Sequence, residues 1–337
     1  MKRMISLLAG LACAAPVMAQ PDGLVYAFDL RGNNEFFTFD PSNAAGGATL
    51  IDDINANLYD TFAMDFSVDA NTLWAVSFPA LELGTINLTD GSFTANTILS
   101  GDVVSGIDNV GGLSFDPTDG TCYANTGTDL LTIDLNTGVA TFVGAPFGST
   151  GLMIDIAIDS QGNMYGMDIT DDSLYSIDKT TGAATIVGVS HGLAANFAQG
   201  MDFDWSDDTL YGAIYTGGGT GQWVSYNLAD GSVNLLFDTT GFGADFGGAE
   251  MEVAIRSVAG GGPVCVGDIA DDFGILGPDG MVSFGDFLAL LGLVGPCPGG
   301  TPGCTGDIAD DFGILGPDGM VSFGDFLALL GLTGPCP

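Results

Sequence analysis

Aspartate and serine recur with fixed spacing near the C-terminus of the chain. Residues 265–298 are repeated as residues 304–337, and the two copies are identical at 32 of 34 positions. Each copy contains five Asp and one Ser but no Lys, Arg, Glu or His. Carboxylate, hydroxyl and carbonyl oxygens are the ligands that calcium prefers. Calcium binding is therefore the first chemistry that the sequence raises.

The whole chain is strongly acidic. Its 337 residues include 42 Asp and Glu but five Lys and Arg, which gives a formal charge of -37. Recognition of nucleic acids and anionic membranes requires clustered Lys and Arg, so we expect no nucleic-acid partner. The 22 Phe, 8 Tyr and 3 Trp exclude a disordered acidic tail and predict a sizeable core. Most surface Asp then serve either solubility in salty water or, where spacing supports it, calcium binding.

The N-terminus predicts export. Residues 1–19 combine a basic start at Lys2 and Arg3 with a short apolar stretch and a small-x-small cleavage site. The apolar stretch is too short to span a membrane, so we expect no membrane insertion. Cys13 raises a lipoprotein alternative, although Gly10 stands where a lipobox usually has Leu. We expect a secreted or cell-envelope protein, located in the periplasm, on the outer surface or outside the cell.

Five cysteines remain after the signal segment. Two pairs each bracket one copy of the repeat, and an oxidising compartment predicts the disulfides Cys265–Cys297 and Cys304–Cys336. Cys122 lies in an alternating apolar run. We expect it to be a buried free thiol rather than a nucleophile.

Residues 20–257 contain a different repeat. Short alternating runs separated by Gly, Asn, Asp and Thr recur every 44 to 49 residues, which predicts four strands and their turns in each unit. The anchor residues of the repeat are Asp40, Asn87, Asp134, Asp178 and Asn227. A four-stranded unit of this length is typical of a propeller blade.

The two ends of this region complement each other. The strand that starts near Leu24 lacks a preceding partner, and residues 249–255 match the missing strand. The sequence therefore predicts an all-β five-bladed β-propeller whose last blade uses both termini, followed by a small C-terminal α/loop region. A solenoid or a sandwich is the alternative. The repeats resemble secreted bacterial propeller repeats of the NHL-like type.

The NHL-like resemblance implies a functional face formed by the loops that enter the innermost strands. Here those loops carry Asp52, Asp53, Asp60, Asp102, Asp108, His191, Asp238 and Asp245. We expect His191 to be a solvated loop residue. On the inner strands, Asp65 and Asp155 lie on one side of their strands. We expect them to line a water-filled central channel, with cation binding as the alternative.

Catalytic chemistry is weakly supported by the sequence. A nucleophilic triad needs a base, and the chain has one His. Nothing singles out a carboxylate pair of the glycosidase type. The strand-end acids Asp116, Asp159 and Asp204 are better explained as turn formers that accept backbone N–H groups. We therefore predict no catalytic residue.

The second half of each C-terminal copy predicts a short helix. Ser283 followed by Asp286 forms an S-x-x-D start, and the apolar residues 287, 288, 290 and 291 cover about two turns. Gly292 and the Gly295-Pro296 pair end the helix.

The same residues match part of an EF-hand loop. Asp279, Gly280, Ser283 and Asp286 fall at its positions 5, 6, 9 and 12. A tandem pair without an incoming helix, at the C-terminus of an exported protein, resembles dockerin-type repeats. This resemblance implies calcium ligation by Asp279, the Met281 carbonyl, Ser283 and Asp286, and by Asp318, the Met320 carbonyl, Ser322 and Asp325 in the second copy.

The loop departs from the EF-hand pattern at its first ligands. Ile275 and Gly277 stand at positions 1 and 3, where Asp or Asn is expected. The acids that could replace them lie upstream: Asp268, Asp271 and Asp272 in the first copy and Asp307, Asp310 and Asp311 in the second. The alternative to calcium binding is a disulfide-stapled helical hairpin whose Asp side chains cap turns. Dockerins that bind cohesins have a shorter period, so a cohesin-like partner is the less favoured expectation.

The predicted organisation comprises six segments. They are a signal peptide (1–19), a propeller (20–257), a linker (258–264), a first dockerin-like repeat (265–298), a second linker (299–303) and a second repeat (304–337). We expect an exported binding protein whose propeller presents a face to an extracellular protein or glycan and whose repeats bind calcium and mediate attachment. The alternative is a calcium-dependent extracellular hydrolase, of the lactonase or glycosidase type, acting on the propeller face.

Overall fold

The structure is a computed structural model. It describes residues 23–30, 35–43, 47–53, 63–103, 109–145, 151–188, 190–197, 199–240, 242, 250–258, 281–296, 320–332 and 334–335. The predicted signal peptide, the four cysteines of the predicted disulfides and the second linker lie outside these residues.

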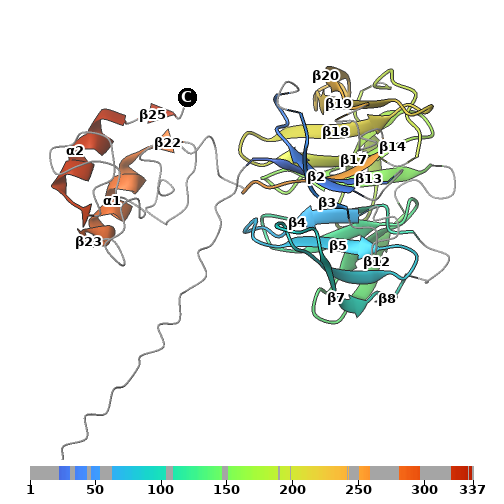
Figure 1. Ribbon diagram of the computed structural model, residues 1–337, viewed down its shortest axis with the longest axis horizontal. Helices are drawn as coiled ribbons and strands as arrows, with labels where there is room; N and C mark the ends of the chain where they lie inside the picture. Colours follow the sequence, from blue (N-terminus) through green and yellow to red (C-terminus); the bar gives the residue numbers. More distant parts are fainter. Residues whose placement is uncertain are drawn as a thin grey trace, which may run out of the picture.

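Five antiparallel sheets are arranged as the blades of a propeller (Figure 1). Blade 1 consists of β4 (Ala63–Phe66), β5 (Leu73–Ser77), β6 (Glu82–Ile86) and β7 (Phe93–Ile98). Blade 2 consists of β9 (Gly112–Phe115), β10 (Cys122–Asn125), β11 (Leu130–Ile133) and β12 (Val139–Gly144). Blade 3 consists of β13 (Met153–Ile158), β14 (Met164–Asp168), β15 (Ser173–Ile177) and β16 (Ala184–Ile186). Blade 4 consists of β17 (Gly200–Asp204), β18 (Thr209–Tyr215), β19 (Gly221–Tyr226) and β20 (Val233–Asp238).

Blade 5 is built from both ends of the propeller region. It consists of β1 (Val25–Asp29), β2 (Glu35–Phe39), β3 (Thr49–Asp53) and β21 (Met251–Ile255). Strand β21 pairs antiparallel with β1, so that Val25 lies opposite Ile255, and in Figure 1 this orange strand lies among the blue ones. Each innermost strand contacts the innermost strands of both neighbouring blades. The predictions of five blades and of closure by both termini are confirmed.

Burial decreases from the axis of the propeller outwards. The innermost strands β4, β9, β17 and β21 are buried along their whole length and β13 at all but one residue, whereas most residues of the outermost strand β7 are exposed. The core lies between blades, because each sheet packs its apolar face on the next. At the junction of blades 4 and 5, Trp223 stacks on Tyr211 at 5.4 Å and its Nε1 donates a 3.0 Å hydrogen bond to the Pro41 carbonyl.

The repeated Thr-Gly pair has a packing role. Gly182 sits in the turn between β15 and β16 with φ +68°, and a Cβ there would lie 2.7 Å from the Cα of Gly144 at the end of β12. The turn of blade 3 thus approaches the outer strand of blade 2 backbone to backbone. Only glycine allows both this φ and this approach.

One strand was not predicted from the repeat. β8 (Ser100–Gly101) follows blade 1 and pairs in parallel with β12, the outermost strand of blade 2. It covers part of an edge that would otherwise present unpaired backbone groups.

The described parts of the two C-terminal copies interlock. The elements are β22 (Met281–Val282), α1 (Phe284–Leu293), β23 (Gly295–Pro296), β24 (Met320–Val321), α2 (Phe323–Leu332) and β25 (Gly334–Pro335). β22 pairs with β25 and β23 with β24, so each copy supplies a strand to the other. Val282, Leu290, Val321 and Leu329 form their shared core. Among the described residues, no helix is both long and apolar enough to cross a membrane.

Candidate functional site

Besides the strand-end Asp204, four acidic side chains lie on the innermost strands of the propeller. Asp65 lies on β4, Asp155 on β13, Asp202 on β17 and Glu252 on β21. All four are buried, with exposed fractions between 1% and 5%. We call these four side chains the axial carboxyl ring.

Each carboxyl group of the axial carboxyl ring accepts a hydrogen bond from the next blade. The acceptor and backbone N–H donor pairs are Asp65 with Phe115 (2.8 Å), Asp155 with Met201 (2.6 Å), Asp202 with Ile255 (2.6 Å) and Glu252 with Met64 (3.1 Å). An innermost strand has one edge without a partner strand, and its N–H groups need acceptors. The ring supplies acceptors at four of the five blade junctions, including the one that closes the propeller.

Burial makes these carboxyl groups hard to ionise. It raises the pKa of Asp65 to about 8, and the nearby charge of Asp155 adds to the effect. The pKa values of Asp155, Asp202 and Glu252 also lie well above the ordinary range, mainly because of burial and then because of the other ring members. Like charges in a low-dielectric site disfavour simultaneous ionisation.

The junction between blades 2 and 3 is built differently. On β9, Ser114 lies opposite Tyr123 of the neighbouring strand β10. On β4, Asp65 occupies the corresponding position opposite Trp74 of β5. Asn125 joins these blades instead, because its Nδ2 donates a 2.9 Å hydrogen bond to the Met153 carbonyl. A Cβ on Gly112 would lie 2.1 Å from Oδ1 of Asp155, so the glycine makes this close approach possible.

The sequence identified half of the axial carboxyl ring. Asp65 and Asp155 were expected on the channel side, but the expectation that they line a water-filled channel is wrong, since both are buried and bonded to backbone. Asp202 and Glu252 were not singled out. A shared sequence pattern could have identified them, because each acid lies between two apolar residues, as in Met64-Asp65-Phe66 and Met201-Asp202-Phe203. Among the described residues, no three His, Cys, Asp or Glu side chains are placed to hold a metal ion.

The strand-end acids form turns, as predicted. Asp116 accepts the Thr118 N–H at 2.9 Å, Asp159 accepts the Gln161 N–H at 3.0 Å, and Asp204 accepts the Ser206 N–H at 2.9 Å. Asp116 also accepts a hydrogen bond from Lys179 of blade 3.

The prediction that His191 is solvated is wrong. Its side chain is 7% exposed and packs edge-on against Tyr226, with ring centroids 6.3 Å apart. Nδ1 accepts a 3.3 Å hydrogen bond from the Leu193 N–H. Burial lowers the pKa of His191, although the charges of Asp172 and Asp171 oppose the shift. The imidazole therefore packs between blades 3 and 4.

The other acids of the predicted face are only partly described. Asp60, Asp108 and Asp245 lie outside the described residues, as do the side chains of Asp52 and Asp53. Asp102 accepts the Phe142 N–H of β12 at 2.9 Å, and Asp238 accepts the N–H of nearby Thr240 at 2.8 Å, so both carboxyl groups bind backbone.

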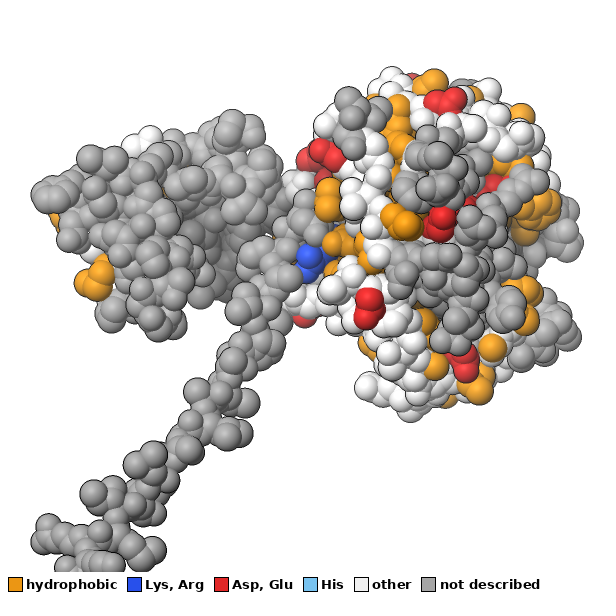
Figure 2. All heavy atoms as spheres, in the orientation of Figure 1, with side chains coloured by type: hydrophobic (Ala, Val, Ile, Leu, Met, Phe, Trp, Pro, Cys, Tyr) orange, Lys and Arg blue, Asp and Glu red, His pale blue; other side chains and the backbone are white. Residues whose placement is uncertain are grey.

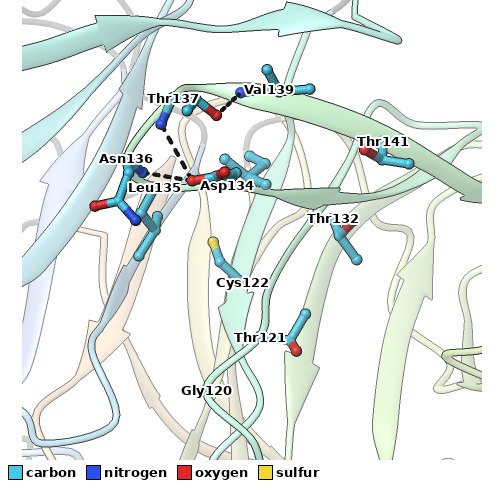
Figure 3. Close-up of a pocket in the computed structure, with 11 residues that line it drawn as sticks. Gly120, Thr121, Cys122, Thr132, Asp134, Leu135, Asn136, Thr137, Val139 and Thr141 are labelled. Atoms are coloured by element: carbon cyan, nitrogen blue, oxygen red, sulfur yellow. Dashed lines mark hydrogen bonds between the residues drawn. The ribbon is translucent and has the colours of Figure 1, made fainter.

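A pocket of about 630 Å³ lies on blade 2 (Figure 3). Thr121, Thr132 and Thr141 line it, and Cys122 lies at its base. Oδ1 of Asp134 accepts the Asn136 N–H at 2.9 Å. Burial and then the charge of Asp65 raise the pKa of the Cys122 thiol. The predicted buried free thiol is confirmed.

Two of the predicted calcium ligands in each copy lie at the start of a helix. Ser283 is the N-cap of α1, its side chain accepts the Gly285 N–H at 3.1 Å, and Asp286 accepts the Ser283 N–H at 2.6 Å. The predicted S-x-x-D helix start is confirmed, and in the structure it forms a capping box. Ser322 and Asp325 make the same bonds in the second copy.

The other predicted ligands stay untested by the described residues. The acids Asp268, Asp271, Asp272, Asp279, Asp307, Asp310, Asp311 and Asp318 lie outside them, as do Cys265, Cys297, Cys304 and Cys336. The backbones of Met281 and Met320 lie in the short strands that precede the helices.

The helices of the C-terminal copies leave an apolar face uncovered. Phe284, Leu288 and Leu291 of α1 are 73%, 43% and 60% exposed. In α2 the values for Phe323, Leu327 and Leu330 are 73%, 44% and 59%. We call these six side chains the twin apolar stripe. On the propeller, by contrast, acidic and apolar side chains lie dispersed over the face shown in Figure 2.

Comparison with known proteins reveals similarity in overall structure alone. No protein-family model and no curated protein matches the chain. A chain of a nidogen/laminin complex has a TM-score of 0.45 at 10% identity, covering 70% of this chain and 99% of that one. A Bacteroides thetaiotaomicron protein of unknown function has a TM-score of 0.42 at 15% identity. The match covers 68% of this chain and 56% of that one.

A virginiamycin B lyase from Staphylococcus aureus, crystallised with quinupristin, is a third similar structure. Its TM-score is 0.38 at 14% identity, with 60% of this chain and 62% of that chain covered. The chain thus spans less than two thirds of the Bacteroides and Staphylococcus chains. Similarities this distant assign neither ligand nor activity.

Proposed function

We propose that the chain is a secreted or cell-surface interaction protein. Its propeller presents a binding face to an extracellular protein or glycan. Its C-terminal dockerin-like repeats bind calcium and attach the protein to a partner at the cell envelope. The predicted signal peptide and the two predicted disulfides fit this setting.

The observation that carries the proposal is the twin apolar stripe. The three side chains of each helix are spaced i, i+4 and i+7, which places them on one side of the helix. The opposite side of each helix already packs in the shared core through Leu290 and Leu329. Exposed apolar patches of this kind mark interaction surfaces in proteins that are otherwise soluble.

The charge around the twin apolar stripe restricts the partner. The chain has no basic residue after Arg256, and the two copies contain ten Asp. A second copy of the same tail would bring two acidic surfaces together, which costs free energy. A protein with an apolar groove flanked by Lys or Arg is the better fit.

Calcium binding is supported by the position of Asp286 and Asp325. Each carboxyl lies in the first turn of its helix, at the place that corresponds to the last ligand position of an EF-hand loop. Asp279 and Asp318 then supply the ligands at position 5 of each loop. Calcium would hold the segment before each helix and so fix the orientation of the twin apolar stripe.

Calorimetric titration of the oxidised full chain with calcium tests the metal component. We expect about one calcium per repeat in the wild type, because each copy carries one ligand set. The double variant Asp279→Ala/Asp318→Ala should lose at least about tenfold in affinity. Asp90→Ala/Asp230→Ala, which removes two exposed turn acids of the propeller, is the matched control. Equal affinity for magnesium, or no heat up to millimolar calcium, would remove calcium from the proposal.

A further inference from the structure

The members of the axial carboxyl ring are unequally supplied with hydrogen-bond donors. Asp65, Asp155 and Asp202 each accept two backbone N–H groups, one from the next blade and one from the residue that follows them. Oε1 of Glu252 accepts the Met64 N–H, whereas its Oε2 is buried without a donor. An ionised oxygen in that position would carry the full cost of desolvation.

Among the described residues, the charges that act on the axial carboxyl ring come from acidic side chains. Of the cationic side chains in the described propeller, Arg256 donates to the Ala70 carbonyl and Lys179 to Asp116. Glu252 faces Asp155, Asp202 and Asp65. Three further titratable groups face the ring: Cys122 from β10, Tyr226 from β19 and Asp204 from β17. Asp29 on β1 follows Phe28, which lies opposite Glu252 in the strand pair β1–β21.

A shared metal ion does not solve this imbalance, because no three of the described acidic side chains are placed around one ion. A proton on Glu252 does solve it. Protonation of Oε2 removes the unsupported charge and leaves Oε1 free to accept the Met64 N–H across the junction of blades 5 and 1. The three Asp carboxyl groups keep both of their backbone donors.

We propose that the axial carboxyl ring is a proton-dependent clasp, in which a proton held on Oε2 of Glu252 keeps the propeller closed and its loss at alkaline pH loosens the junction between blades 5 and 1. The proposal concerns the propeller and is independent of calcium binding by the C-terminal repeats.

The direction of the pH effect follows from linkage. Groups whose pKa is higher in the folded state stabilise it most below their unfolded pKa, and they lose that contribution as the pH rises through the folded pKa. For Asp65 this window runs from about 4 to about 8. The propeller should therefore be most stable in mild acid and weaken steadily towards alkaline pH.

Thermal unfolding between pH 5 and pH 9 tests the clasp. Trp74, Trp205 and Trp223 all lie in the propeller, so Trp fluorescence reports its unfolding without the tail. EDTA in every sample keeps metal binding out of the measurement. The wild type and the control Glu82→Gln should lose more than about 4 °C over this range, whereas Glu252→Gln, a permanent mimic of the protonated acid, should lose less than half as much.

Equal pH slopes in Glu252→Gln and the wild type would overturn the proposal. So would a wild-type loss that calcium in place of EDTA abolishes, because the ring would then take a cation. If Glu252→Gln does not fold, infrared spectra of the wild type test whether a carboxyl group of the ring is protonated. The carbonyl band of a protonated carboxyl group must persist at pH 7 and disappear reversibly towards pH 9; its absence at pH 7 rejects the clasp.

Discussion

Single residues decide how closely the blades approach at the axis. The position opposite the aromatic residue of the second strand carries Asp65 on β4 and Asp202 on β17 but Ser114 on β9, and Gly112 on β9 leaves room for Asp155. Asp65 and Asp155 could be recognised from the sequence because alternation places them on one side of a strand. Their burial could not, because it depends on how far apart five strands from distant parts of the chain settle.

Gly112→Ala should destabilise the propeller by about 1–3 kcal/mol, because the new Cβ would lie 2.1 Å from Oδ1 of Asp155 and the strands must move apart. Urea unfolding followed by Trp fluorescence measures the loss. A double-mutant cycle with Asp155→Ala is the control: removing the carboxyl should recover part of the loss. A change below about 0.5 kcal/mol in Gly112→Ala would show that the junction is not tightly packed.

At the scale of elements, the sequence predicted the hairpins best. Strand-end acids and Thr-Gly pairs recur because each turn needs an acceptor for its N–H groups and a glycine where blades meet. The helix starts at Ser283 and Ser322 were predicted equally well, because a capping box involves residues only three apart in the sequence. Strand β8 and the pairing of β22 with β25 could not be predicted from the sequence. These strands have two residues each, too few for a periodicity, and their partners lie far along the chain.

Asp159→Ala should cost about 1–3 kcal/mol, since the carboxyl organises the turn between β13 and β14 by accepting the N–H groups of Gln161 and Asn163 at 3.0 and 2.7 Å. Asp159→Asn keeps an acceptor for these groups and should lose less than half as much. Urea midpoints of the two variants make the comparison. If Asn is as damaging as Ala, the charge and not the turn geometry is what the site requires.

For the whole molecule, the repeat period and the complementary ends were sufficient to predict a closed five-bladed propeller. Closure brings Glu252 beside Met64, residues separated by nearly the length of the domain. The site was less predictable than the fold. The His side chain is a packing residue and the axial acids are buried. The feature that best supports a function is an apolar surface on the C-terminal copies, whose sequence predicted calcium binding through Asp residues.

In our proposal, the twin apolar stripe attaches the protein to a partner at the cell envelope. The most direct measurement is co-sedimentation of the purified chain with envelope from the cells that produce it, in calcium and in EDTA. We compare the wild type with Leu291→Ser/Leu330→Ser, which changes side chains that are 60% and 59% exposed. The matched control is Ile98→Ser/Leu235→Ser on the outer propeller strands, 59% and 53% exposed.

We expect the wild type and the propeller control to bind in calcium and to be released by EDTA. The stripe variant should bind at least about tenfold more weakly, as expected when central apolar contacts of an interface are lost. Equal binding of all three proteins, or a loss confined to the propeller control, would contradict the assignment of attachment to the C-terminal repeats.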